Sequence, residues 1–272
     1  MNNPWQDIIR YPLGQRLEKP RKKGLTMVMD KGLGPRELTD LLEMAGEHLD
    51  FLKLGFGTSA LYDEKLLKAK TQLCREYNVK AYPGGTLMEI AYLQGRYEAY
   101  LAQLIKLGFD TVEISDGTIT LNKSNRFYCI KRAASLGLTV LTEVGKKDPT
   151  ENPSVEELID LCQEDLAAGA WKVIMEARES GKGIGIFDKN GSILDEKLDQ
   201  LAESLSTVLS QIIWEAPLKN QQVEMILRFG PQVNLGNIQP NELISLEALR
   251  TGLRGDTLRM IAPALLAELV SV

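Results

Sequence analysis

Histidine and cysteine are scarce in this sequence, and their positions exclude several classes of site. The only histidine, His48, lies just past a predicted helix and opposite the strand ends where a site is expected, so a Ser–His catalytic triad is excluded. Cys74, Cys129 and Cys162 are widely spaced, and each falls in a segment with a helical pattern. We therefore predict buried thiols rather than a disulfide framework or a metal knuckle.

Long apolar runs and long basic runs are also missing. No apolar run reaches the roughly 18 residues that cross a bilayer, and the amino terminus lacks the basic and apolar regions of a signal peptide. We expect a cytoplasmic protein with no membrane partner. The net charge of -5 and the single short basic stretch at residues 19–23 argue against a nucleic-acid surface.

Short β-branched runs alternate with longer amphipathic segments, as they do when parallel strands are joined by crossover helices. The predicted strands are Leu25–Asp30, Leu49–Leu54, Val79–Tyr82, Thr111–Ser115, Thr139–Val144, Trp171–Glu176, Gln211–Glu215 and Gln232–Leu235. The predicted helices are Pro35–Ala45, Ala60–Tyr77, Leu87–Leu107, Asn122–Leu136, Val155–Ala168, Asp195–Leu209, Gln221–Phe229 and Asn241–Leu249. No G-x-G-x-x-G follows the first strand, so eight such units favour a closed barrel over an open doubly wound sheet. We predict an α/β protein, a single (β/α)8 TIM barrel over residues 25–272 with an N-terminal extension at residues 1–24.

Charged or amide side chains end seven of the eight predicted strands, and the third ends in a Gly-Gly-Thr turn. In such a barrel the loops at the carboxyl ends of the strands converge on one mouth, where active sites lie. Unpaired charges in a cleft are costly unless they bind a ligand. The strand-end glutamates could simply pair with neighbouring lysines. They could also hold Mg²⁺, and the candidate metal ligands are Glu113, Asp116, Glu176 and Glu215.

Basic side chains and glycine-rich turns near the same strand ends point to an anionic, phosphorylated small molecule. The candidates for binding it are Lys31, Lys53, Arg178, Ser180, Lys182, Asn237 and Arg254. Lys53, Lys146 and Lys147 could each act in acid–base catalysis or form a Schiff base with a carbonyl substrate. The residue types alone leave these two mechanisms open.

The strand-end motifs strongly resemble those of the phosphosulfolactate synthase family, and the resemblance runs from about residue 25 to residue 258. The motifs that carry it are Val28-Met29-Asp30-Lys31-Gly32, Lys53-Leu54-Gly55-Phe56-Gly57-Thr58-Ser59, Tyr82-Pro83-Gly84-Gly85-Thr86-Leu87, Val112-Glu113-Ile114-Ser115-Asp116-Gly117, Leu141-Thr142-Glu143-Val144-Gly145-Lys146-Lys147, Glu176-Ala177-Arg178-Glu179-Ser180-Gly181-Lys182-Gly183, Glu215-Ala216-Pro217, Gln221-Gln222, Val233-Asn234-Leu235-Gly236-Asn237-Ile238 and Gly252-Leu253-Arg254-Gly255-Asp256-Thr257.

The resemblance implies a carbon–sulfur lyase that works in the synthetic direction. It would catalyse the Mg²⁺-dependent addition of sulfite to C3 of phosphoenolpyruvate, which gives (2R)-phospho-3-sulfolactate. A lysine would protonate C2: the resemblance favours Lys147, with Lys146 next and Glu143 as a further catalytic residue. In this family the reaction opens a route to coenzyme M in methanogenic archaea, and spore-forming bacterial relatives make sulfolactate. The resemblance also suggests a homo-oligomer, a trimer or larger.

Two other functions stay open on the sequence alone. The first is a Schiff-base aldolase that uses Lys53 or Lys147. The second is a non-catalytic protein, because plant heat-stress-associated proteins resemble this same family. The presence of Glu143, Lys147 and Arg178 favours catalysis.

Overall fold

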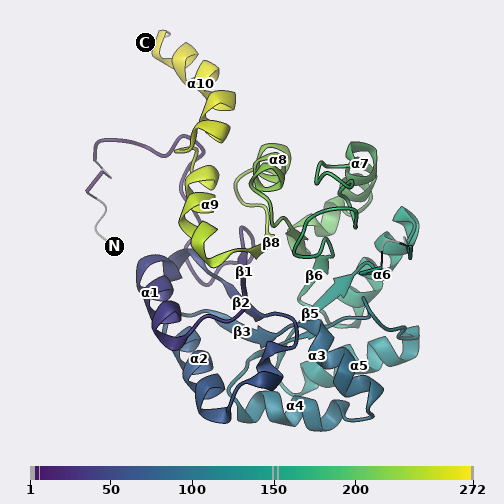
Figure 1. Cartoon of the computed structure of the whole chain (residues 1–272). Coiled ribbons are helices and arrows are strands. Elements are labelled where there is room, and N and C mark those ends of the chain that lie inside the picture. The colour runs from purple at the N-terminus through teal and green to yellow at the C-terminus, as the bar shows by residue number, and fades with distance from the viewer. Residues whose placement is uncertain (1–3, 6, 149, 152, 271–272) are drawn as a thin grey trace.

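Eight parallel strands form one nearly closed (β/α)8 barrel in the computed structural model, which describes residues 4–5, 7–148, 150–151 and 153–270 (Figure 1). The strands are β1 (Thr26–Asp30), β2 (Phe51–Leu54), β3 (Lys80–Pro83), β4 (Thr111–Ile114), β5 (Thr139–Val144), β6 (Lys172–Met175), β7 (Ile212–Glu215) and β8 (Leu235–Ile238). The predicted fold class is confirmed.

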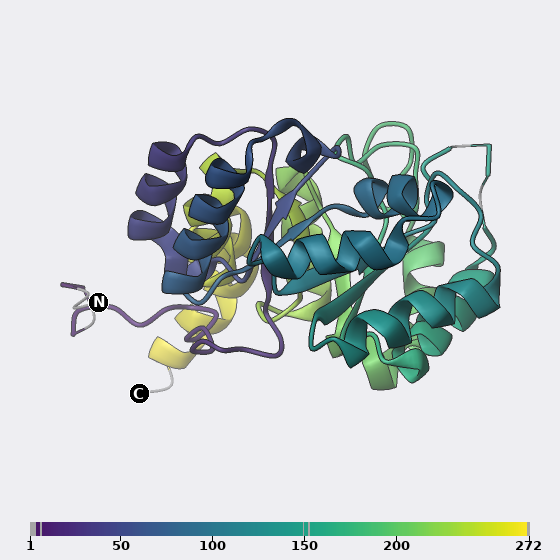
Figure 2. The same cartoon turned by 90° about the horizontal axis from the view of Figure 1, so that it is seen from below.

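Helices surround the strands (Figure 2). They are α1 (Pro35–Ala45), α2 (Glu64–Glu76), α3 (Gly85–Leu93), α4 (Tyr97–Lys106), α5 (Lys123–Ser135), α6 (Val155–Ala168), α7 (Asp195–Ser204), α8 (Lys219–Phe229), α9 (Leu243–Arg250) and α10 (Gly255–Val270). Cys74, Cys129 and Cys162 lie on α2, α5 and α6 as buried free thiols, as predicted. No helix in the described part of the chain is long and apolar enough to cross a membrane.

The barrel interior is apolar toward the amino ends of the strands, its lower half, and charged toward their carboxyl ends, its upper half. The two-residue period of the strands explains both. Side chains two positions apart point to the same face of a strand. Apolar side chains therefore lie one inward position below charged ones. These inward pairs are Phe51 and Lys53 on β2, Leu141 and Glu143 on β5, and Ile213 and Glu215 on β7, while Ile174 at the end of β6 lies below Glu176. The lower side chains fill the interior and exclude water below the charges.

The hydrogen-bonded order of strands runs from β3 through β1 and β8 to β4, so β3 and β4 are the two ends of the sheet. Side chains bridge the seam between them. The Ala81 N–H donates to Asp110 Oδ1 at 3.3 Å. The Gly85 N–H donates to Glu113 Oε1 at 2.6 Å. Two carboxylates thus accept backbone hydrogen bonds at the edge that the ladder leaves open.

Several predicted elements were wrong in extent, and two of them differ most from the structure. The single helix predicted over Leu87–Leu107 is two helices, α3 and α4, because the chain turns at Gly95, which has a φ of 65°. The last strand was predicted at Gln232–Leu235, yet β8 runs over Leu235–Ile238. Gly236 and Asn237 disfavour a strand in sequence terms, and Asn234 instead binds the lower ends of β1 and β7 through its side chain.

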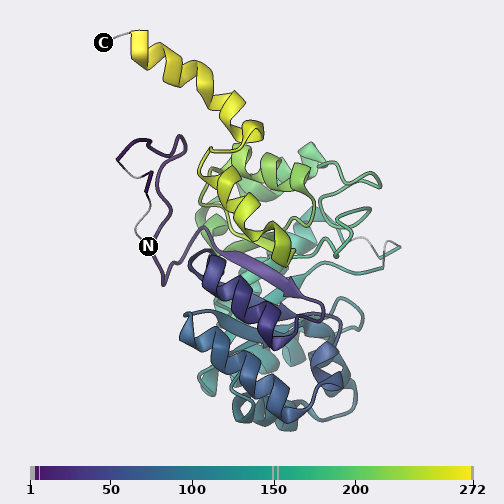
Figure 3. The same ribbon diagram turned by 60° about the vertical axis from the view of Figure 1, so that its left-hand side comes forward.

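The N-terminal segment contacts the amino ends of the strands, and α10 projects away from the barrel (Figures 1 and 3). Lys19 Nζ donates to the carbonyls of Gly46 and Tyr77, and the Arg21 guanidinium pairs with Asp50. These contacts lie at the end of the barrel opposite the mouth. The α10 helix had not been predicted.

Candidate active site

Six charged side chains meet inside the upper barrel, and we call them the ionic layer: Lys53, Glu113, Glu143, Lys147, Glu176 and Glu215. Lys53 Nζ lies 3.0 Å from Glu113, 3.1 Å from Glu143 and 3.6 Å from Glu215. Lys147 Nζ lies 3.0 Å from Glu143 Oε1 and 3.7 Å from Glu176 Oε2. The four glutamates are almost completely buried. The neighbouring-lysine pairing considered for these acids is therefore present, yet four carboxylates face two ammonium groups.

The neighbouring carboxylates favour the ammonium form of both lysines of the layer. Burial lowers the pKa of Lys147, but attraction to Glu143 and Glu176 outweighs it and raises that pKa above its ordinary value. Burial likewise opposes charge on Lys53, and Glu113, Glu143 and Glu215 together raise its pKa well above the usual range. The surroundings of both lysines therefore favour the ammonium form, which a general acid requires, over the neutral amine that attacks a carbonyl.

The four glutamates differ in their affinity for a proton. Burial raises the pKa of Glu113 to about 7, and burial with repulsion from Glu143 and Glu215 raises the pKa of Glu176 well above its usual range. Burial also raises the pKa of Glu215. For Glu143, attraction to Lys147 and Lys53 outweighs burial and lowers the pKa. Glu143 is thus the carboxylate that holds both ammonium groups in place.

A cavity of about 160 Å³ opens above the layer, at the carboxyl ends of the strands. Arg178 and Asn237, both predicted to bind substrate, line it together with the six charged side chains. Arg178 has a φ of 59° and Asn237 a φ of 57°, conformations that residues other than glycine seldom adopt and that cluster at functional sites. The Arg178 N–H donates to Glu176 Oε1 at 2.6 Å, which fixes the start of the loop after β6.

Four other residues predicted to bind substrate do not line this cavity. Lys31 is at the rim, where its ammonium pairs with Glu179 at 2.9 Å. Ser180 and Lys182 are exposed in the loop between β6 and α7. Arg254 follows α9 and pairs with Asp256 at 3.1 Å. Of these four, Lys31 is tied to the mouth, through a glutamate that lines it.

Asp116 and Lys146 lie beside the ionic layer rather than in it. Lys146 Nζ donates to the carbonyls of Asp116 and Ile119 at 2.6 and 3.0 Å, and it pairs with Asp116 Oδ2 at 3.2 Å. Asp116 Oδ1 accepts a hydrogen bond from Arg126 at 2.9 Å. Sequence reasoning missed Arg126, because it lies on a helix and only strand ends were searched. The structure thus separates the two adjacent lysines: Lys147 faces the mouth and Lys146 faces the loop after β4.

The ionic layer suits a divalent cation that takes only part of its ligands from protein. No group of three or more acidic, histidine or cysteine side chains among the described residues is arranged to hold a metal. Glu176 Oε2 is nevertheless buried without a hydrogen-bond partner, and its nearest ammonium, Lys147 Nζ, is 3.7 Å away, whereas Glu113 Oε2 already pairs with Lys53 at 3.0 Å. Mg²⁺ commonly binds one or two carboxylates and completes its shell with water and substrate oxygens. Such an ion fits here, whereas a cage made of protein alone does not.

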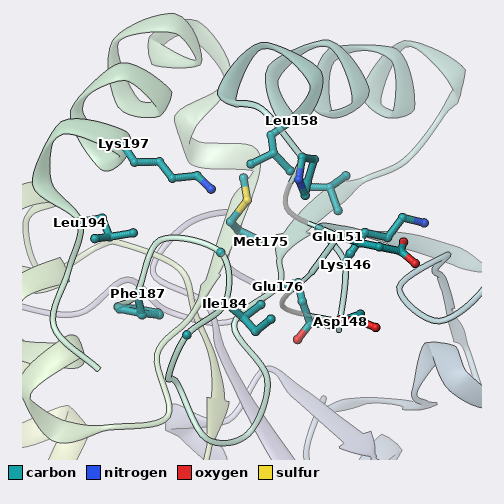
Figure 4. A pocket seen from close by; sticks show the side chains of 15 residues that line it. Lys146, Asp148, Glu151, Leu158, Met175, Glu176, Ile184, Phe187, Leu194 and Lys197 are labelled. Atoms are coloured by element: carbon teal, nitrogen blue, oxygen red, sulfur yellow. The ribbon is translucent and has the colours of Figure 1, made fainter. Parts of the chain in front are cut away.

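A smaller cavity of about 100 Å³ lies between the loops that follow β5 and β6 (Figure 4). Its wall is mixed, with Leu158 and Met175 beside charged side chains such as Asp148 and Lys197, and Glu176 lines both cavities. Figure 4 places Lys146 and Lys197 on opposite sides of it. The volume is small for a phosphorylated substrate, so we assign the chemistry to the larger cavity.

Comparisons with known proteins converge on one family. A family model described as (2R)-phospho-3-sulfolactate synthase matches residues 14–256. The phosphosulfolactate synthase of Methanothermobacter thermautotrophicus is 47% identical over 89% of this chain and 94% of its own length. That of Bacillus subtilis is 36% identical over 89% of this chain and 95% of its own length. The HEAT-STRESS-ASSOCIATED 32 protein of Arabidopsis thaliana is 22% identical over 86% and 88%.

Solved structures share the fold at much lower identity. The YdjI aldolase of Escherichia coli superposes with a TM-score of 0.54 at 11% identity, and the match covers 89% of this chain and 90% of that one. At this identity the likeness concerns the barrel and not its chemistry.

Proposed function

The chain belongs to the phosphosulfolactate synthase family of enzymes, and we propose that it adds sulfite to C3 of phosphoenolpyruvate and forms (2R)-phospho-3-sulfolactate. The observation that carries the proposal is the Lys147 ammonium, held 3.0 Å from Glu143 at the floor of the mouth. Addition of an anion to phosphoenolpyruvate creates a carbanion that needs a proton, and Lys147 is a proton donor above a water-excluding core.

The proposed reaction needs one bond to sulfur and one proton. The sulfur lone pair attacks C3, and the C2–C3 π electrons move to C2 and its carboxylate. Lys147 then donates its proton to C2, which completes phosphosulfolactate, and it regains a proton from solvent. A lysine fixed on one side of the bound molecule protonates one face of C2 and sets the configuration. Sulfite requires no base, because it is already an anionic nucleophile.

The other members of the mouth hold charge. Lys53 lies at the floor of the cavity between three carboxylates, and Arg178 and Asn237 line the wall where the substrate anions would bind. We propose that Lys31, Ser180 and Lys182 reach the substrate from the rim, and that Arg254 contributes from the loop before α10. Bidentate hydrogen bonding suits an arginine to a phosphate or sulfonate group.

Mg²⁺ is part of the proposal. Glu176 and the neighbouring Glu215 would hold it, since Glu176 Oε2 is buried without a hydrogen-bond partner; Glu113 is a further candidate. When bound, such an ion stabilises negative charge on substrate oxygens. Asp116 is a weaker candidate, because Arg126 and Lys146 already occupy its carboxylate.

The proposed activity predicts a metal-dependent product. Purified protein incubated with phosphoenolpyruvate, sulfite and Mg²⁺ should form phosphosulfolactate, detected by mass spectrometry and ³¹P NMR. Treatment with EDTA should abolish formation, and added Mg²⁺ should restore it. Folded protein that gives no product with Mg²⁺ present would overturn the proposed function, and product formation unaffected by EDTA would overturn the metal requirement alone.

A Schiff-base aldolase remains the competing enzyme, and the charge of the two lysines disfavours it. Because their neighbours raise the pKa of Lys53 and Lys147, we expect borohydride with a carbonyl substrate to leave both unmodified in a peptide map. A reduced adduct on either would favour the aldolase. If no product forms, the 22% identity to the heat-stress-associated protein favours a non-catalytic role.

We further propose a cytoplasmic homo-oligomer of three or more copies. The pathway would be coenzyme M or sulfolactate formation. Light scattering that finds a monomer would exclude the oligomer.

A further inference from the structure

Arg126 joins three parts of the barrel behind the ionic layer. Its guanidinium is buried on α5, and it binds both oxygens of Asp165 on α6 at 2.7 and 2.6 Å. It also donates to Asp116 Oδ1 at 2.9 Å and to the carbonyl of Glu143 at 3.0 Å. One side chain therefore connects α6, the loop after β4 and the end of β5. The planar fork of arginine suits this geometry, and lysine could not reproduce it.

Lys146 fastens the same loop from the other side. Its ammonium binds the carbonyls of Asp116 and Ile119 and the Asp116 carboxylate. We call Arg126, Asp116, Lys146 and Asp165 the loop clamp. It connects the loop after β4 to the end of β5, which Lys147 follows closely in the chain.

Lys147 rests on the clamped loop. Its backbone N–H donates to the Gly117 carbonyl at 3.0 Å. A Cβ at Gly117 would lie only 3.1 to 3.2 Å from Cγ, Cδ and Cε of Lys147, so the absent side chain makes room for the lysine stem. On its other side the ammonium meets Glu143, whose own Oε1 accepts from Ser115 at 3.0 Å. Movement of this loop would therefore move the Lys147 ammonium.

We propose that the loop clamp is a positioning device, in which Arg126 and Lys146 hold the loop after β4 so that the Lys147 ammonium stays beside Glu143 and faces C2 of the substrate. The inference rests on the proposed function for the role of Lys147, and on the contacts above for its position. Neither Arg126 nor Lys146 lines the larger cavity. A displacement of about 1 Å between reacting groups can cost on the order of 100-fold in rate.

The main test replaces Lys146 with methionine and uses Lys106→Met as the matched control, since Lys106 makes one exposed ion pair with Glu64 on the outer helices. Lys146→Met should lower kcat about 10- to 100-fold and change KM for phosphoenolpyruvate less than about threefold. The solvent isotope effect on kcat should rise, because protonation of C2 becomes slower. Lys146→Arg should recover part of the rate, and Arg126→Lys should reproduce the loss. Circular dichroism and a thermal melt verify folding in each variant.

A second measurement is independent of turnover. Lys147 is released from Glu143 if the clamp fails, so its acylation by acetic anhydride, followed by peptide mass spectrometry, should quicken several-fold in Lys146→Met and stay unchanged in Lys106→Met. Unchanged labelling of Lys147 in folded Lys146→Met would overturn the inference, whether or not the wild-type protein makes phosphosulfolactate. Wild-type protein that makes no product, with labelling that responds as expected, would overturn the proposed function and leave the clamp supported.

Discussion

Replacement of Lys147 with methionine should lower kcat for phosphosulfolactate formation by about 10²- to 10⁴-fold, the range that a positioned general acid contributes. The binding of phosphoenolpyruvate should change little, because the proposed proton transfer follows binding. The physical basis is the ammonium that Glu143 and Glu176 hold at the mouth, with a pKa raised by those two carboxylates. Methionine keeps the length of the stem and removes the proton.

The experiment needs two measurements and one contrast. Turnover is followed by ³¹P NMR with saturating sulfite, and phosphoenolpyruvate binding is followed by calorimetry without sulfite. Lys182→Met serves as the contrast, since loss of a lysine that holds a substrate anion should raise KM and leave kcat close to that of wild type. If Lys147→Met lost binding and turnover equally, Lys147 would be an anion-holding residue and the proton would have to come from elsewhere.

The sequence predicts the ionic layer well because strand periodicity determines it. Glu143 and Glu215 lie at or next to the carboxyl ends of their strands, and a parallel barrel gathers such positions in one mouth. The same logic explains why Lys53 lies above Phe51. These placements depend only on strand direction and the two-residue period, so a single sequence is enough to infer them.

The partners of those charges could not be predicted in the same way. Asp116 follows β4 and looks like a member of the mouth, but Arg126 draws its carboxylate toward α5. The sequence does not distinguish the adjacent Lys146 and Lys147. Lys146 points to the loop after β4 because the carbonyls of Asp116 and Ile119 and the Asp116 carboxylate accept its hydrogen bonds there. Such choices depend on how helices pack against the strands. No local sequence pattern predicts that packing.

Replacement of Lys53 with methionine should lower the free energy of unfolding by about 3 to 5 kcal/mol at neutral pH, as expected when one partner of a buried charge network is removed. Lys53 lies within 3.6 Å of three almost completely buried glutamates. Without it, those carboxylates repel one another in a site that water reaches poorly. The measurement is urea unfolding followed by circular dichroism. Lys106→Met, which breaks one exposed pair, should cost about 1 kcal/mol or less.

A double variant separates lost charge from lost packing. In Lys53→Met with Glu113→Gln, one of the opposed carboxylates becomes neutral, so the double variant should be more stable than Lys53→Met alone. A double variant that is less stable than Lys53→Met would show that the amide cannot replace the carboxylate that accepts the Gly85 N–H. In that case electrostatic repulsion would not be the main cost.

The pH dependence of the unfolding free energy of Lys53→Met distinguishes repulsion between carboxylates from lost packing. Burial already raises the pKa of Glu113 from 4.5 to about 7, so between these values the folded state binds more protons than the unfolded state, and the unfolding free energy falls as pH rises. Loss of Lys53 removes a cation that lowers the pKa of Glu113, Glu143 and Glu215. The fall should therefore be steeper and extend to higher pH. The variant should thus be closer to wild-type stability at about pH 5 than at about pH 8. An equal deficit at both would place the cost in packing, because only repulsion between ionised carboxylates responds to protonation.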